Sequence, residues 1–206
     1  MPHNRTAAAC TILALTASGL LVATPTNAHV ADMAKTTKSF KYKCKVKAGG
    51  MVINPAAVKM TVSAKLPSSI EAGSTLRRRA VTVKVAMPDV IRDNAVSVLR
   101  AKKASGSAPK AHLGVKINKS TSKVAVKNLT APKRKIPRKG TWTITAKGKV
   151  GKVRIPAKAS GSAKISVPKR LRIKAKLFRR NGSKLKAGLT CKAPKKRVFG
   201  TVSISG

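Results

Sequence analysis

Acidic and aromatic residues are the classes that this sequence has least of. Its 206 residues include only 4 Asp and Glu, and only 2% are aromatic, with 1 Trp and 1 Tyr. Few carboxylates leave little material for acid-base catalysis, and few aromatics leave little for stacking on nucleic-acid bases. The chain also lacks the Cys and His spacing of a zinc site and any phosphate-binding glycine loop. The sequence therefore predicts no enzyme, no metal, no cofactor and no small-molecule substrate.

Histidine is also scarce, with 3 in the chain. His29 follows the expected export signal and His112 falls in an expected loop. Neither is accompanied by the Ser or Cys partner pattern of a hydrolase. A hydrolase stays open only as a hypothesis in which activity would depend on His112 or Asp89.

Positively charged residues, in contrast to acidic ones, are abundant. Lys and Arg number 46, which gives a formal net charge of +42, yet 42% of residues are hydrophobic and the cations alternate with them. That interleaving favours a folded domain over a disordered basic tail. Lys outnumbers Arg by 32 to 14, which favours hydrated point charges over bidentate recognition. Mutual repulsion should destabilise the fold, and an anionic partner would relieve it.

Residues 1–28 are predicted to be a secretory signal peptide. An apolar stretch from Ala7 to Ala23 follows Arg5, and Thr26 to Ala28 form a small-residue cleavage site. A membrane anchor is the alternative, but the apolar run is short and interrupted. Cys10 lies inside that run, which disfavours a lipoprotein. We expect a secreted protein, extracellular or associated with the cell wall, with residues 29–38 as a polar lead-in.

The cysteines fit an oxidising compartment. Cleavage after Ala28 removes Cys10 and leaves Cys44 and Cys191, an even pair. We expect them to form one disulfide, with two free thiols as the alternative.

Strict two-residue alternation dominates the mature chain. From Arg170 to Leu177, cations occupy one face and apolar residues the other, which is the pattern of a half-buried β-strand. The same pattern predicts strands at 40–47, 58–64, 81–85, 115–117, 124–126, 141–146, 152–155, 164–167 and 198–204. Asn181 and Gly182 predict a hairpin turn. We expect an all-β, two-lobed immunoglobulin-like β-sandwich over residues 39–206, with possible lobes at 39–128 and 129–206. The segment Lys-Ala-Ser-Gly-Ser-Ala, repeated at 103–108 and 158–163, is a weak trace of two related lobes.

One short helix is expected after Pro88, with Ile91, Ala95, Val98 and Leu99 at helical spacing. Asp89 and Asp93 share one face of it and could suggest an acid-base or metal pair. The preference of helix N-termini for negative charge explains them better.

The basic clusters are the one positive functional signal. Each alone resembles a solvated surface, but a surface of one dominant sign must hold counterions or a polyanion. The candidate polyanion-binding residues are Arg77, Arg78, Arg79, Lys133, Arg134, Lys135, Arg138, Lys139, Arg170, Arg172, Lys174, Lys176, Arg179, Arg180, Lys195, Lys196 and Arg197.

Several features together resemble a family of secreted actinobacterial proteins known as domain of unknown function 6801. They are the aromatic-x-Cys opening at Tyr42 and Cys44, the run from Val62 to Pro67 followed by Gly73, the Met87-Pro88 helix entry closed by Ser105-Gly106, the segment from Pro137 to Gly148, and the late Cys191 before a last strand. The resemblance covers about residues 39–206. It implies a two-lobed, immunoglobulin-like protein outside a Gram-positive cell, with a disulfide joining its first and last parts, and it implies no activity. The Lys and Arg content of this chain is unusual for that family and leaves any shared ligand open.

The leading functional hypothesis is a secreted, non-enzymatic β protein that binds anionic cell-wall polymers through many Lys and Arg contacts. Non-specific binding of extracellular DNA is one alternative, since phosphate contacts need no sequence recognition. A cationic effector acting on anionic membranes is another, although a strongly amphipathic helix is lacking.

Overall fold

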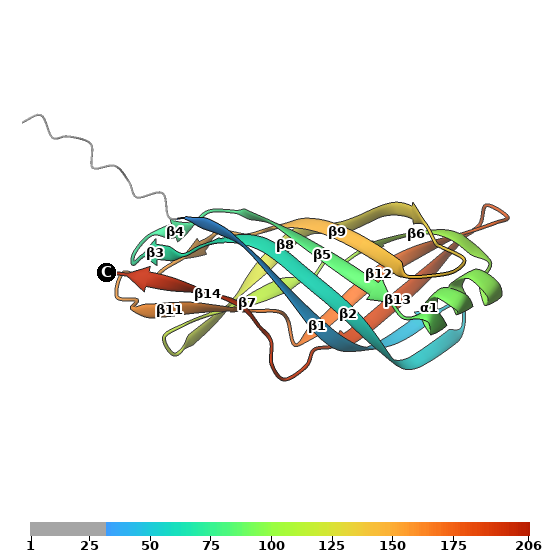
Figure 1. Ribbon diagram of the computed structural model, residues 1–206, viewed down its shortest axis with the longest axis horizontal. Coiled ribbons are helices and arrows are strands. Elements are labelled where there is room, and N and C mark those ends of the chain that lie inside the picture. Colours follow the sequence, from blue (N-terminus) through green and yellow to red (C-terminus); the bar gives the residue numbers. More distant parts are fainter. Residues whose placement is uncertain (1–31) are drawn as a thin grey trace, which may run out of the picture. The chain divides into compact units, whose positions relative to one another are not determined.

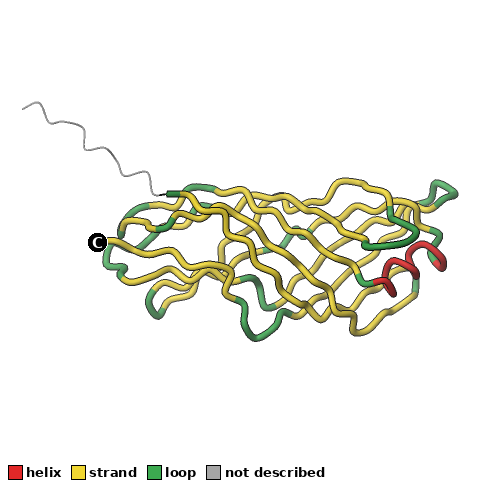
Figure 2. Tube along the Cα trace, in the orientation of Figure 1, coloured by secondary structure: helices red, strands yellow, loops and turns green. Residues whose placement is uncertain are grey.

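Long antiparallel strands build the protein. The computed structural model describes residues 32–206, so the expected signal peptide lies outside the described residues. The longest strands are β1 (Met33–Ala48), β2 (Met51–Pro67) and β8 (Ser120–Lys135) (Figure 1). The others are β3 (Ser69–Glu71), β4 (Thr75–Leu76), β5 (Arg79–Met87), β6 (Ala101–Ser107), β7 (His112–Ile117), β9 (Trp142–Val150), β10 (Val153–Arg154), β11 (Gly161–Ser166), β12 (Arg170–Arg179), β13 (Lys184–Lys192) and β14 (Val198–Ser205). The all-β prediction is confirmed, and strands make up most of the trace in Figure 2.

Eight strands close into a barrel. Their order is β8-β6-β12-β13-β1-β2-β5-β9, and β9 pairs back onto β8 at Val126, Lys127 and Thr130. The expectation of an immunoglobulin-like sandwich therefore needs correction, because a sandwich has two separate sheets with free edges. Here every strand of the ring has a neighbour on both sides, which removes those edges.

The bend in β8 makes this closure possible. Its first part pairs with β7 from Ser120 to Ala125, whereas its last part pairs with β6 from Thr130 to Lys135. Between them Asn128 has a φ of 53°, a left-handed conformation that Asn tolerates better than most residues. At Gly148 of β9 an added Cβ would lie 3.0 Å from the Lys127 carbonyl oxygen, so β9 can approach the bend only with glycine there. From β7 the sheet continues outside the ring through β11 and β14 to β3.

The possible lobe boundary at residues 128 and 129 falls inside β8. The described residues do not divide there, because β1 from one side pairs with β13 from the other. The repeated hexapeptide adopts two conformations, since Gly161 has a φ of 78° and Gly106 lies within β6 without a positive φ. β1 begins at Met33, so part of the range assigned to the lead-in is strand.

The predicted helix is present at one end of the barrel (Figure 1). It consists of α1 (Asp89–Asp93) and the π-helical turn η1 (Asn94–Val98). Ile91, Ala95 and Leu99 are buried as the spacing predicts, but Val98 is 64% exposed. The α-helical spacing placed Val98 on the inner face, whereas the wider π-helical turn rotates it outward.

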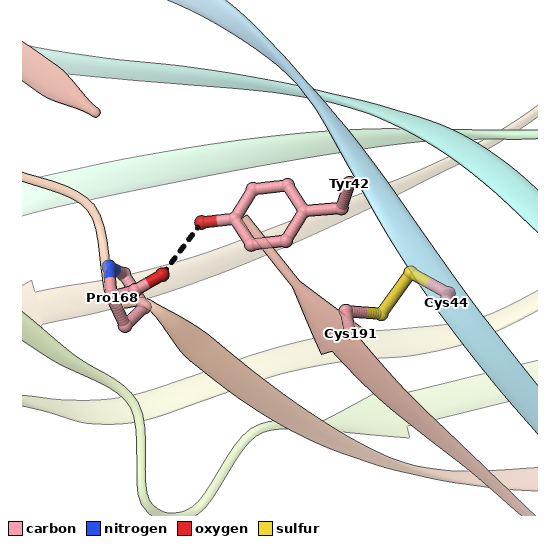
Figure 3. The surroundings of a disulfide bond; sticks show 4 residues. All are labelled: Tyr42, Cys44, Pro168 and Cys191. Carbon is pink, nitrogen blue, oxygen red and sulfur yellow. Dashed lines mark hydrogen bonds between the residues drawn. A yellow bond between two sulfur atoms is a disulfide. The ribbon is translucent and has the colours of Figure 1, made fainter. Parts of the chain in front are cut away.

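The contact between β1 and β13 includes some of the most deeply buried side chains of the core. Cys44 faces Cys191 across the two strands with 4.0 Å between their Cα atoms, and the two form the predicted disulfide (Figure 3). Tyr42 is 2% exposed and its hydroxyl donates to the Pro168 carbonyl oxygen at 3.3 Å. Along β1 from Phe40 to Ala48, buried and exposed side chains alternate without exception, which confirms the sequence pattern.

The hairpin between β12 and β13 has the predicted Asn181-Gly182 turn. Gly182 has a φ of 84°, and the Asn181 side-chain oxygen accepts from the backbone N–H of Ser183 at 3.1 Å and from its hydroxyl at 2.8 Å. This turn fixes the register of the two strands.

We expect the double substitution Cys44→Ala with Cys191→Ala to lower the free energy of unfolding. The bridge spans a sequence separation of 147 residues. Loops of that size correspond to about 5 kcal/mol in the chain-entropy model, and measured losses are roughly 2–5 kcal/mol. Urea unfolding of the variant, and of the wild-type protein with and without reductant, measures the loss. Coincident transitions for all of them would contradict the prediction.

We also expect Tyr42 to ionise at high pH. Burial raises the pKa of Tyr42 from 10.0 to about 12, against the opposing effect of the Arg197 charge. Since the unfolded chain would ionise first, the contribution of Tyr42 to stability is complete below pH 10.0 and is lost as the pH rises to about 12. The chain has 1 Tyr, so phenolate absorbance reports it directly. A folded-state midpoint no higher than that in denaturant would refute the prediction.

Candidate polyanion-binding face

The cations of β12 point outward as the alternation predicts. Arg170, Arg172, Lys174 and Lys176 are all exposed, while Leu171 and Leu177 between them are buried. The apolar side chains of β12 pack inside the barrel and hold the strand in place. Its charged side chains remain exposed to water.

The structure adds two neighbouring strands to this row. β13 pairs with β12 along its length and β1 pairs with β13, so outward cations from all three share one surface. We call this surface the cationic face and define it by the exposed residues Lys43, Lys45, Lys47, Arg170, Arg172, Lys174, Lys176, Lys184, Lys186 and Lys192. Those from β1 and β13 are not among the sequence-predicted site residues. The Cys44–Cys191 pairing was the available signal, because it places β1 beside the strand that carries Cys191.

Like charges lie directly opposite one another on this face. Arg170 is the register partner of Lys192, which is in turn the partner of Lys43, and Lys176 is the partner of Lys186. β1, β12 and β13 contain no Asp or Glu. Like charges in directly opposed positions destabilise a sheet by roughly 0.2–1 kcal/mol per pair, so this arrangement costs stability unless anions screen it.

A second cluster adjoins the cationic face through β6. Lys135 is the register partner of Lys103, and β6 pairs on its other side with β12. Lys103, Lys133, Arg134 and Lys135 line a surface hollow of about 420 Å³. The Lys133 ammonium lies 4.9 Å from the centre of the Phe178 ring, a cation–π contact that holds the cluster against β12.

The other predicted residues are dispersed. Arg77 and Arg78 are exposed and Arg79 is half-buried at the start of β5, a strand that pairs with β2 and β9 and not with β12. Arg138 and Lys139 are exposed in the loop before β9. Lys195 and Lys196 are exposed in the loop that leaves β13. Arg180 is exposed in the β12–β13 turn and Arg179 is half-buried beside it.

One predicted binding residue has a structural role. Arg197 is half-buried and its guanidinium donates to the Val167 carbonyl oxygen at 2.9 Å. That bond holds the segment before β12 close to the segment before β14. Arg197 is therefore less free to contact a ligand than its neighbours Lys195 and Lys196.

The two carboxylates of the helix, Asp89 and Asp93, form ion pairs with the buried Arg92. Asp89 and Asp93 each lie 2.8 Å from the guanidinium of Arg92, which is only 8% exposed and also donates to the Gly140 carbonyl oxygen. The pair thus fixes Arg92 between the helix and the loop that carries Arg138 and Lys139. Sequence reasoning found the carboxylates and missed Arg92, although its position i+3 from Asp89 was a readable signal.

Residues 32–206 hold no group of three or more His, Cys, Asp or Glu side chains able to bind a metal ion. His112 is half-exposed, and its ring nitrogen lies 3.4 Å from the Lys110 carbonyl oxygen. His29 lies outside the described residues. In the same range no helix is long and apolar enough to cross a membrane.

Comparison with protein-family models gives a match over most of the chain. A family described only as a family of unknown function, DUF6801, matches residues 41–200. This confirms the resemblance seen in the sequence. No curated protein and no solved structure matches the chain significantly.

Because cations face one another across the strands, we expect the melting temperature to rise with salt. The Debye length falls from about 30 Å at 0.01 M to about 3 Å at 1 M, which removes most repulsion on the surface. Calorimetry across this range measures the rise. Replacing Lys43, Arg170 and Lys192 by Gln should flatten the salt dependence more than replacing Lys110, Lys119 and Lys158, which are exposed in turns. Equal salt dependence in both variants would show that the opposed pairs have no special role.

Proposed function

We propose that this chain, which belongs to the DUF6801 family, is a secreted, non-enzymatic protein that binds anionic cell-envelope polymers through its cationic face. The observation that carries the proposal is the density of exposed Lys and Arg across β12, β13 and β1, with no carboxylate on those three strands. Neutralising that surface would both bind the polymer and relieve a repulsion within the protein.

Sheet geometry supports many weak contacts over one precise contact. Neighbouring strands lie about 4.8 Å apart and outward residues along a strand are about 7 Å apart, so the cations form a regular lattice. Eight of its ten members are Lys, whose flexible ammonium groups do not require a fixed ligand geometry. Such a lattice suits a flexible polymer with repeated phosphates or carboxylates, which can bind in many registers.

The adjoining hollow extends the proposed surface. The hollow is lined by Lys103, Lys133, Arg134 and Lys135. A polymer that crosses from β12 to β6 would therefore contact cations along its whole path. On β1 and β2 two hydroxyl pairs, Thr37 with Ser63 at 2.9 Å and Ser39 with Thr61 at 2.8 Å, lie between two further opposed cation pairs, Lys35 with Lys65 and Lys41 with Lys59.

The test is retention of the protein on immobilised anionic wall polymer and on duplex DNA, matched for charge density, across a salt series. A face variant carries Gln at Lys43, Lys45, Lys47, Arg172, Lys174 and Lys186. A matched control carries Gln at Lys110, Lys116, Lys119, Lys123, Lys158 and Lys164, which are exposed around β7, β11 and the first part of β8. Both lose the same charge.

We expect the face variant to leave the wall polymer at much lower salt than the control. On DNA each lost phosphate contact should reduce the slope of log K against log salt by about 0.9, and so by up to about 5 for six contacts. An equal loss of retention in both variants would show that binding depends on net charge and not on the cationic face. Equal, steeply salt-dependent retention of the wild-type protein on both polymers would replace the envelope role with that of a generic polycation. Leakage of anionic-lipid vesicles at the same concentrations would favour the membrane alternative.

A further inference from the structure

The end of the barrel next to the helix contains an apolar cavity. Its volume is about 90 Å³, and its lining includes Val85, Met87, Trp142, Ile144 and Leu177. The only polar side chains that line it are Asn94, Ser105 and Ser107. The amide nitrogen of Asn94 is already bonded to the Val90 carbonyl oxygen at 2.7 Å, so the cavity offers little to a polar ligand.

Small residues on four neighbouring strands explain the space. Ala175 of β12 is the register partner of Gly106 of β6 and of Ala187 of β13, which is the partner of Ala48 of β1. Larger side chains at this level would fill an eight-stranded barrel, whereas these leave room for a small guest. Ile173, Ala175 and Ala187 point inward between exposed cations, yet they are only half-buried, as expected for walls of an incompletely filled cavity.

A basic depression lies beside this cavity. It has a volume of about 690 Å³ and is lined by the η1 turn and by Arg100, Arg179, Arg180 and Asn181. Leu99 is the one residue that lines both the depression and the cavity. Leu99 packs against the β1–β2 turn, where an added Cβ on Gly49 would lie 3.4 Å from it.

Two features of the depression point to an anionic group. Arg179 is one of three arginines that line the depression, and its buried Nε, like that of Arg79 elsewhere, has no hydrogen-bond partner among the described residues, which is unfavourable for a buried donor. Arg100, next to Leu99, has a φ of 51°, and its carbonyl oxygen accepts from the backbone N–H of Arg180 at 3.1 Å, which brings the two cations to the same rim.

We propose that the barrel binds a single-chain anionic amphiphile, such as a fatty carboxylate. The end of its alkyl chain occupies the apolar cavity, the chain passes Leu99, and the carboxylate lies in the depression with Arg100, Arg179 and Arg180. An engineered apolar cavity of about 150 Å³ binds benzene, so a cavity of about 90 Å³ takes only the end of a chain. The site is distinct from the cationic face, because neither the cavity nor the depression is lined by any residue that defines that face.

The single Trp of the chain makes a direct test possible. Trp142 lines the cavity and is 5% exposed, so it senses the cavity and not the charged surface. Decanoate with bromine on its terminal carbon should quench Trp142 fluorescence, because bromine quenches at contact range. Decanoate with bromine beside the carboxylate should quench it little. Equal quenching by the two isomers, or none, would overturn the proposal.

Two sets of variants test the cavity for the alkyl chain and the depression for the carboxylate separately. Ala175→Leu fills the cavity and should weaken decanoate binding by at least about tenfold, whereas Ala80→Leu, exposed on β5, should not. Should Ala175→Leu fail to fold, the smaller Ala187→Val serves in its place. Arg100→Gln with Arg180→Gln should weaken decanoate by about tenfold and leave decanol unchanged, as expected for loss of charged hydrogen bonds. Lys116→Gln with Lys119→Gln is the control of equal charge. Equal affinity for decanoate and decanol in the wild-type protein would remove the anionic head from the proposal.

Discussion

β1 and β13 lie side by side, with Cys44 opposite Cys191 on the inner side and Lys43 opposite Lys192 on the outer side. The outer pair repels, and the same repulsion recurs between Arg170 and Lys192 on the next strand. On the inner side the disulfide and buried residues such as Tyr42 and Val46 hold these strands together. Full burial of one such apolar side chain contributes roughly 1.5–3 kcal/mol, more than one opposed pair of cations costs. The strands of the cationic face can therefore stay paired despite their charge density because the disulfide and the buried side chains on their inner side stabilise the pairing by more than the repulsion costs.

Strict alternation also protects the register. A slip of one residue along β12 would bring Arg172 and Lys174 into the barrel and expose Leu171 and Leu177, so competing registers are far less stable. The disulfide fixes β13 against β1 in the same way. A highly charged chain could otherwise remain unfolded, and here the alternation of charge makes misaligned pairings costly.

Local patterns made part of this structure predictable. The alternation at β1 and β12, the Cys44–Cys191 bridge and the Asn181-Gly182 turn each depend on neighbouring residues or on cysteine number. β13 was missed because Ala187 and Gly188 interrupt its apolar pattern, and β6 because its Lys and Gly resemble the end of a helix. Ring closure depends on the bend of β8 at Asn128 and on partners distant in sequence, which alternation does not specify. The cationic face was therefore predictable strand by strand but not as a surface.

The polymer and the alkyl chain of the amphiphile are proposed to bind on opposite sides of the same strands. Along β12, the outward residues Lys174 and Lys176 determine charge, whereas the inward Ala175 between them determines how much space the barrel encloses. Because side chains on the two sides do not contact one another, a substitution on one side changes the other only through the stability of the whole sheet. Polymer retention and amphiphile binding should therefore respond to different substitutions. A change in both at once would point to altered folding and not to either site.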